Sequence, residues 1–180
     1  TDMLVNNNHF KIEWFTPEQI GKKLVEVNVS DIAACGGKPL YAVVSFALPK
    51  KTETKFIEQV YQGIYNTAKK YNLLIIGGDT TSGSEINFSM TMIGEVEKQN
   101  LCLRNDAKQG DLICVTGTLG KSMAGLQLFL NNKQGYKKDY LEPKARLDIN
   151  QKIAPLVNAM IDISDGLSSE IKHICNASNV

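Results

Sequence analysis

The stretch LIIGGDTTSG, Leu74 to Gly83, joins a short apolar run to two glycines, a carboxylate, two hydroxyls and a third glycine. The apolar run predicts a strand over 73–76 that leads into Gly77, Gly78 and Asp79. Two interpretations are open. Glycine ends strands and Asp and Thr favour turns, so the polar part could be an ordinary turn. Alternatively, the glycines let a bulky anion approach the backbone while Asp79 holds a cation, which requires further carboxylates in similar settings.

The segments around this stretch predict a layer of strands and helices. Helices are expected over 16–34 and 53–71, the first opened by the capping sequence Thr16-Pro17-Glu18-Gln19. Tyr41–Leu48 predicts a buried strand, closed by Pro49. Apolar and polar residues alternate over 86–92, which predicts a strand with one covered face. Its apolar positions are Ile86, Phe88, Met90 and Met92.

The composition becomes polar and rich in turn residues over 97–110, where we expect a domain boundary. Beyond it, strands are predicted over 112–115 and 160–163. Helices are predicted over 121–130, 148–157 and 167–177. The fold class is therefore α/β, with an N-terminal domain over 1–100 and the start of a second α/β domain over 101–180.

Composition restricts the function classes. Of the 180 residues, 43% are hydrophobic and 22% charged, as in a soluble globular protein, and the net charge of +1 favours neither a nucleic-acid surface nor a membrane patch. No apolar run approaches the roughly 20 residues that a membrane span needs. The four cysteines form no C-x-x-C pair, which argues against zinc and favours reduced thiols in the cytoplasm. With only two histidines, a metal would be hard and oxygen-bound, such as Mg²⁺.

Asp31 lies on what the sequence suggests is a buried helix face. The apolar stripe of Ile20, Leu24 and Val27 reaches Asp31 when it is extended by four residues. A buried carboxylate is costly unless a cation or hydrogen bonds compensate it. Alternatively, the helix has turned toward solvent by that point, or Asp31 caps a neighbouring segment.

Two more carboxylates occur in Asp162-Ile163-Ser164-Asp165-Gly166, between a predicted strand and a predicted helix. An Asp N-cap would explain one of them. The other, Asp162, would remain at an apolar strand end, where an unpaired charge is expensive. Helix N-termini also attract phosphate through their free N–H groups.

The sequence Gly117-Thr118-Leu119-Gly120-Lys121-Ser122 resembles a P-loop, but only two residues separate its glycines where a P-loop has four. A Walker-type nucleotide site is therefore rejected in favour of a glycine turn before a helix. Five aspartates share another kind of setting: they lie at strand ends, in loops or on an apolar helix face, among small residues. They suggest a site for several Mg²⁺ ions and a phosphate ligand, and they are Asp2, Asp31, Asp79, Asp162 and Asp165.

Five short motifs also occur in an order and at spacings that are typical of one enzyme family. They are Thr1-Asp2-Met3-Leu4-Val5 with His9-Phe10, Asn28-Val29-Ser30-Asp31-Ile32-Ala33-Ala34, Gly77-Gly78-Asp79-Thr80-Thr81, Arg104 with Ala107-Lys108-Gln109-Gly110-Asp111, and Asp162-Ile163-Ser164-Asp165-Gly166-Leu167. With them, essentially the whole chain resembles thiamine-monophosphate kinase, a family in the superfamily of aminoimidazole ribonucleotide synthetase.

The resemblance implies transfer of the γ-phosphoryl group of ATP to thiamine monophosphate, in a homodimer formed through the sheet of the N-terminal domain. It implies metal ligands at Thr1, Asp2, Asp31, Asp79, Asp162 and Asp165. It implies ATP contacts at Tyr61, Gly78, Asp79, Arg104 and Ser164, and a contact of His9 with thiamine monophosphate. The phosphate nucleophile is already anionic, so no strong general base is required.

Two departures from the family pattern stand out. Asn6-Asn7-Asn8 replaces the acidic and glycine residues expected before His9, so the local loop can differ. The family also has an acidic motif upstream of Thr1 and substrate residues downstream of Val180, so we expect both domains to be incomplete. Two rival functions are a ligase or synthetase of the same superfamily that acts on a ribonucleotide amide, and a non-catalytic nucleotide-binding scaffold.

Overall fold

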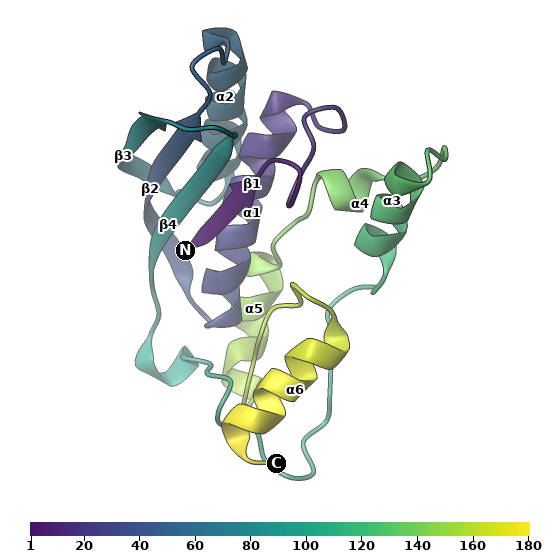
Figure 1. Cartoon of the computed structure of the whole chain (residues 1–180). Helices are drawn as coiled ribbons and strands as arrows, with labels where there is room; N and C mark the ends of the chain where they lie inside the picture. Colours follow the sequence, from purple (N-terminus) through teal and green to yellow (C-terminus); the bar gives the residue numbers. More distant parts are fainter.

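The computed structural model describes residues 1–180 and contains one four-stranded mixed sheet with helices (Figure 1). The strands are β1 (Asp2–Val5), β2 (Lys38–Leu48), β3 (Leu74–Ser82) and β4 (Asn87–Glu95), in the order β1-β4-β2-β3. β2 and β3 are parallel, whereas β4 is antiparallel to both of its neighbours. The mixed α/β fold class predicted from the sequence is confirmed.

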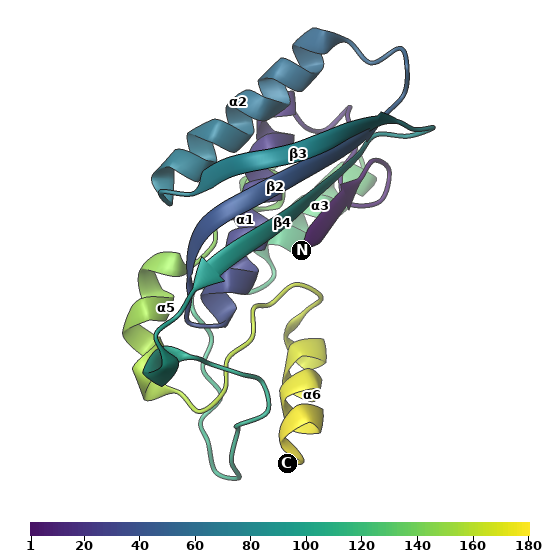
Figure 2. The ribbon, with the colours of Figure 1, turned by 90° about the vertical axis from the view of Figure 1, so that its left-hand side faces the viewer.

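Two long helices cover one face of the sheet. They are α1 (Pro17–Ala34) and α2 (Thr54–Lys70), and Figure 2 looks onto the opposite face, which carries no helix. The predicted capping box is present: the Gln19 N–H donates to the Thr16 hydroxyl at 3.2 Å, and the Thr16 N–H donates to the Gln19 side chain at 3.0 Å. These bonds fix the point where α1 begins.

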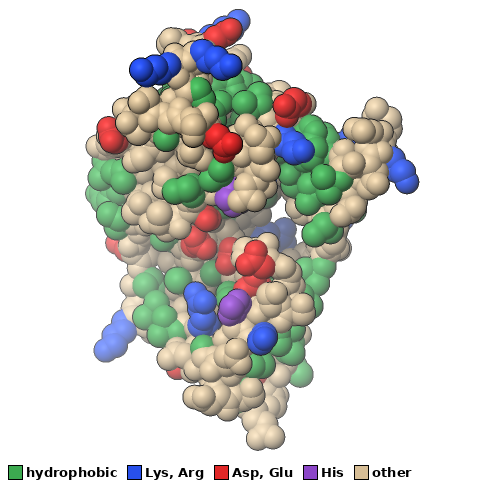
Figure 3. All heavy atoms as spheres, viewed as in Figure 1, with side chains coloured by type: hydrophobic (Ala, Val, Ile, Leu, Met, Phe, Trp, Pro, Cys, Tyr) green, Lys and Arg blue, Asp and Glu red, His purple; other side chains and the backbone are tan.

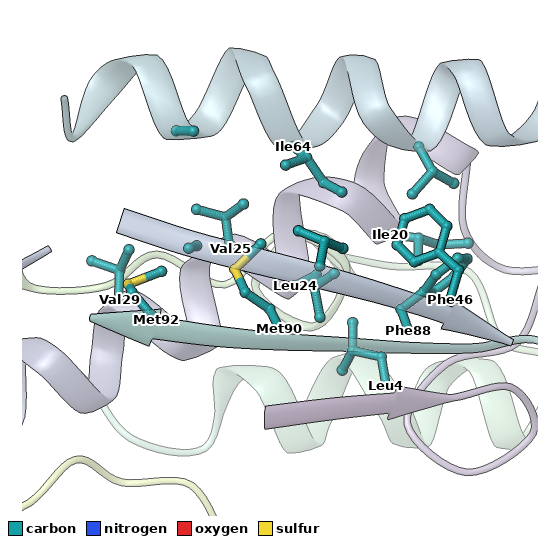
Figure 4. Packing of buried hydrophobic residues seen from close by; sticks show 14 of the residues in the cluster. Leu4, Ile20, Leu24, Val25, Val29, Phe46, Ile64, Phe88, Met90 and Met92 are labelled. Carbon is teal, nitrogen blue, oxygen red and sulfur yellow. The ribbon is translucent and has the colours of Figure 1, made fainter. Parts of the chain in front are cut away.

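The hydrophobic core lies between the sheet and these helices (Figure 4). Phe46 of β2 and Phe88 of β4 are buried side by side, with ring centroids 4.6 Å apart in an edge-on arrangement. The alternation expected over 86–92 is confirmed, because Ile86, Phe88, Met90 and Met92 are all buried while the residues between them are not. One face of β4 therefore supplies much of the core.

α1 and α2 cross at a pair of glycines. A Cβ atom on Gly21 would lie 2.0 Å from the Val60 carbonyl oxygen, and one on Gly63 would lie 2.1 Å from the Glu18 carbonyl oxygen. Only glycine allows two helix backbones to approach this closely. The contact fixes the position of α1 relative to α2 within the helix layer.

Two predictions about the strands need correction. β3 does not end at Ile76 but runs through both glycines to Ser82, because β2 continues to offer backbone partners up to Leu48. The turn interpretation of Gly77–Asp79 is therefore wrong. β2 is also not buried on both faces: Tyr41 and Val43 lie on the uncovered face and are exposed.

The second half of the chain contains helices but no strand. They are η1 (Lys98–Asn100), α3 (Lys121–Leu130), α4 (Lys138–Leu141), α5 (Leu147–Ile153), η2 (Ala154–Leu156) and α6 (Leu167–Ser178). The strands expected over 112–115 and 160–163 do not form, since neither segment pairs with another strand in a ladder. The boundary near residue 100 stays a prediction. None of the helices has both the length and the apolar composition needed to cross a lipid bilayer.

The glycine crossing provides a test of the packing. In a free helix, Gly→Ala stabilises by about 1 kcal/mol. We expect Gly21→Ala to destabilise the protein instead, by about 1–3 kcal/mol, because the added methyl group would collide with the Val60 carbonyl. Urea unfolding followed by circular dichroism measures this change. Glu58→Ala, at an exposed position of α2, is the control and should change stability by less than about 0.5 kcal/mol. A more stable Gly21→Ala variant would contradict the close crossing.

Candidate functional site

Three carboxylates from distant parts of the chain lie near one another beside the edge strand β1. Asp2 lies on β1, Asp31 in the last turn of α1, and Asp162 in the loop before α6. The Ser30 hydroxyl donates to Asp162 at 2.8 Å and so joins α1 to that loop. Figure 1 shows this loop rising toward the N-terminus and α1, and Figure 3 shows acidic side chains gathered around the hollow there. We call Asp2, Asp31 and Asp162 the acidic group.

The electrostatics confirm that these carboxylates interact. Burial, together with the charges of Asp162 and Asp2, raises the pKa of Asp31 from its ordinary value of 3.8 to about 6. The pKa of Asp2 is raised too, first by burial, with Asp162 adding to the effect. Asp31 as a whole residue keeps an exposed surface although its carboxyl group is partly buried, so the alternative in which α1 has turned toward solvent is correct. Its carboxylate is nevertheless close enough to Asp162 and Asp2 for their charges to raise its pKa.

Arg104 supplies positive charge near the acidic group. Its charge lowers the pKa of Asp31, against the effects of burial and of the other carboxylates. The Ser178 hydroxyl at the end of α6 donates to the Arg104 carbonyl at 3.0 Å and so anchors this segment. Cys35, directly after α1, also borders the acidic group: burial raises the pKa of its thiol, and Asp31 raises it further. The sequence interpretation gave Cys35 no role in the site.

His9 lies beside the acidic group on the loop after β1. A positive charge on its ring would lower the pKa of Asp2, and the ring is exposed. The Val5 N–H donates to His9 Nδ1 at 3.0 Å, which places the proton of the neutral ring on Nε2. The Lys23 ammonium donates to the His9 carbonyl at 2.9 Å and lies over the rings of Phe15 and Tyr140. Burial lowers the pKa of Lys23 to about 8, and these contacts hold the His9 loop in place.

The loop before α6 is organised by a residue that the sequence interpretation missed. Glu170, in the first turns of α6, is buried and accepts hydrogen bonds from the Asp165 N–H at 3.0 Å and the Ser164 hydroxyl at 3.4 Å. Asp165 does not cap the helix, because Gly166 occupies the N-cap position without a side-chain cap. An acidic residue early in a predicted helix was the available signal.

Other predicted site residues lie on the uncovered face. Asp79 pairs with Ser45 of β2. Ser45 alternates with the buried Val44 and Phe46, so Ser45 and its partner Asp79 point away from the core. Asp79 is exposed there, two strands beyond β4 and on the face opposite to the core. The Thr1 hydroxyl also points to this side and donates to Thr91 at 3.0 Å.

Gly78 and Tyr61 have packing roles in the structure. A Cβ atom on Gly78 would lie 1.9 Å from the Val44 carbonyl oxygen, so pairing of β2 with β3 requires glycine at this position. Tyr61 lies on α2 and packs against Phe46 with ring centroids 5.0 Å apart. Neither residue contacts the acidic group within this chain.

The donors fit Mg²⁺ in kind. The oxygens of the acidic group are hard ligands. Burial first, and neighbouring carboxylates second, raise the pKa values of Asp2 and Asp31, and a bound cation would offset both effects. No three His, Cys, Asp or Glu side chains are close enough to form a complete metal site by themselves. Mg²⁺ is commonly held by one or two carboxylates together with water and substrate phosphates, so the acidic group would need such further ligands.

Comparison with known proteins identifies the family. Residues 1–96 match the model of AIR synthase related protein, N-terminal domain. The chain belongs to this family. Members of known function support the resemblance inferred from the motifs: the thiamine-monophosphate kinase of Bacillus subtilis (strain 168) is 40% identical, with 99% of this chain and 58% of that protein covered. The thiamine-monophosphate kinase of Pyrococcus horikoshii is 42% identical, with 100% and 58% covered.

Among solved structures, one described as AaThiL complexed with AMPPCP and TMP has a TM-score of 0.93 and 36% identity, and covers 99% of this chain and 59% of its own. The fold of this AIR synthase related chain is therefore that of the solved relative. The chain spans somewhat more than half the length of the curated relatives that it matches.

The raised pKa of Asp31 predicts how stability depends on pH. Its carboxyl group has a pKa of about 6 in the folded chain and an ordinary value of 3.8, so ionisation opposes folding above about pH 6 and has no effect below about pH 4. We expect Asp31→Asn, without divalent metal, to raise the Tm near pH 8 and to leave it unchanged near pH 4. Differential scanning calorimetry in the presence of a chelator measures the effect.

Asp148→Asn, at an exposed position of α5, is the control for that measurement and should leave the Tm unchanged at either pH. A Tm of Asp31→Asn equal to that of the natural chain across this range would show that neither burial nor the neighbouring carboxylates penalise ionised Asp31.

Proposed function

We propose that the protein is an ATP-dependent kinase that phosphorylates thiamine monophosphate to thiamine diphosphate. The observation that carries the proposal is the acidic group, assembled from three separate segments and bordered by Arg104 and His9. Two further facts support it. The chain is 34–42% identical to thiamine-monophosphate kinases over nearly its whole length, and it has the fold of the AaThiL structure described as complexed with AMPPCP and TMP.

In this proposal, the acidic group and Asp165 hold magnesium, and Arg104 and Ser164 contact ATP. Bound magnesium would neutralise phosphate charge, which allows two anions to approach each other. His9 presents its Nε2 proton toward thiamine monophosphate, since Nδ1 is occupied by the Val5 N–H. The residues of the chain therefore align the two phosphates, and no side chain needs to act as a strong base.

We propose that Asp79, Gly78, Tyr61 and Thr1 contribute from the β3 side of the molecule. Asp79 would hold a further magnesium ion, Gly78 and Tyr61 would contact ATP, and Thr1 would add a hydroxyl ligand beside Asp2. Because Asp79 and Thr1 lie on the uncovered face, this part of the proposal requires a ligand or a second chain that reaches that face.

We also propose a homodimer that forms through the uncovered face of the sheet. This face exposes a set of large apolar side chains, which are Met3, Tyr41, Val43, Leu74, Ile76 and Ile93. Exposed apolar patches of this kind mark interaction surfaces, and a twofold axis would place the same patch on both partners. The four cysteines are free thiols, and we place the enzyme in the cytoplasm, where thiols stay reduced.

The proposed reaction is tested with the full-length protein, ATP, Mg²⁺ and thiamine monophosphate. We expect thiamine diphosphate from the natural protein, and a loss of roughly a hundredfold or more in kcat for Asp31→Asn and Asp162→Asn, because each removes charge that the phosphates and magnesium require. Thiochrome fluorescence measures the product. Asp148→Asn should retain the natural rate.

If the natural protein makes no thiamine diphosphate, the proposed function is wrong, and product from a ribonucleotide amide would favour the ligase alternative. Natural rates in both site variants would instead remove the acidic group from the mechanism.

The dimer is tested by sedimentation at micromolar concentration. We expect the natural protein to be a dimer and Ile76→Glu to shift it toward monomer, because Ile76 is 59% exposed on the uncovered face. Tyr65→Glu is the matched control, since Tyr65 is 53% exposed but lies on α2. A monomeric natural protein, or an equal effect of the two variants, would contradict an interface at the sheet.

A further inference from the structure

Two carboxylates are buried in this chain without an ion-pair partner. Glu26 is 3% exposed and Glu170 is 4% exposed, whereas the chain's salt bridge joins Lys22 and Glu142. An ionised carboxylate away from water is costly unless hydrogen bonds satisfy it. The donors that each one has gathered therefore indicate what it stabilises.

Glu26, on α1, stabilises the fold by joining α1 to the end of α2 and to the backbone at Ala145. It accepts hydrogen bonds from the Tyr71 hydroxyl at 2.7 Å and from the Ala145 N–H at 2.8 Å. Neither donor belongs to the acidic group or borders it. Glu26 thus serves as an internal reference, a buried carboxylate with a purely structural role.

Glu170 gathers its donors from the loop that carries Asp162. Its Oε1 accepts from the Asp165 N–H at 3.0 Å and from the Ser164 hydroxyl at 3.4 Å. The loop turns into α6 at Gly166, which has a φ of 116° and provides no side-chain cap. Without Glu170, the backbone just before α6 would lose its side-chain acceptor. The far end of the same loop is held by the bond from Ser30 to Asp162.

We propose that Glu170 is a positioning residue for the loop that carries Asp162, Ser164 and Asp165, the residues assigned to magnesium and ATP. It fixes the Ser164 hydroxyl and the Asp165 backbone, so that Asp162 stays opposite Asp31 in the absence of ligand. This inference rests on the proposed function, which assigns Ser164 to ATP and Asp162 to magnesium. Glu170 itself is buried, so in this proposal it acts through the loop and makes no contact with the ligands.

The test compares binding of Mg²⁺ with a non-hydrolysable ATP analogue in the full-length protein, measured by calorimetry without thiamine monophosphate. We expect Glu170→Ala to weaken this binding roughly tenfold to a hundredfold, as loss of a residue that orients metal ligands does. We expect Glu170→Gln to bind within about threefold of the natural protein, because its amide oxygen can still accept from Asp165. Glu26→Ala is the matched control, with a lower Tm and unchanged binding.

Each outcome decides the question. Binding by Glu170→Ala that equals the natural protein, or an equal loss in Glu26→Ala, would overturn the positioning role. If Glu170→Ala does not fold, Glu170→Asp replaces it: the shorter side chain keeps the charge but cannot reach both donors, so weaker binding supports the proposal and natural affinity overturns it. A natural protein that binds the analogue but makes no thiamine diphosphate would contradict the proposed reaction and leave the Glu170 comparison valid.

Discussion

The packing of α1 against both the sheet and the neighbouring helix α2 determines where the charged groups of the site lie. Ile20, Leu24 and Val29 are fully buried against the core, and the Gly21 crossing leaves no space on the α2 side. The end of the helix is held as well, because the Asn150 side chain of α5 donates to the Ala33 carbonyl at 2.9 Å. With both sides and the end fixed, the last turn of α1 presents Ser30 and Asp31 in a single direction.

The site is then assembled from segments that are distant in sequence, by hydrogen bonds more than by ion pairs. Ser30 binds Asp162, and Glu170 binds the backbone of Asp165, so the loop before α6 is held at both ends. The fold thereby brings carboxylates together although burial and mutual repulsion raise the pKa of Asp31. Local arrangements that oppose stability are typical of functional sites, where a ligand supplies the missing charge.

Local sequence signals predicted the elements of the first half well. The capping box at Thr16 and the alternation over 86–92 depend only on neighbouring residues, and both are confirmed. The course of β3 could not be predicted in this way, because the strand passes its glycines only through its pairing with β2. The apolar segment 112–115 shows the reverse error: apolar content suggests a strand, but no neighbouring strand pairs with it.

The site residues differ in the same way: some could be predicted from their sequence neighbours, and others depend on contacts between distant segments. Asp31 and Asp162 were singled out because a charge stood in an apolar context, and the structure brings them together. Glu170 was missed, because its role depends on a side chain that folds back onto a loop. The face on which Asp79 lies was also beyond local reasoning, since the register shift between Ala42 and Val43 decides which β3 residues point away from the core.

The two faces of the sheet connect the position of Asp79 with the question of assembly. Asp2 and Asp79 lie on the two edge strands, three strand spacings apart, and the backbones are therefore separated by about 14 Å. A single Mg²⁺ ion contacts its ligands at about 2 Å, so it cannot bridge carboxylates at that distance on opposite faces. Either the two carboxylates bind different ions along an extended ligand, or a second chain on the uncovered face completes the surroundings of Asp79. In both cases the apolar side chains around Asp79 matter for function, because they determine what can lie next to its charge.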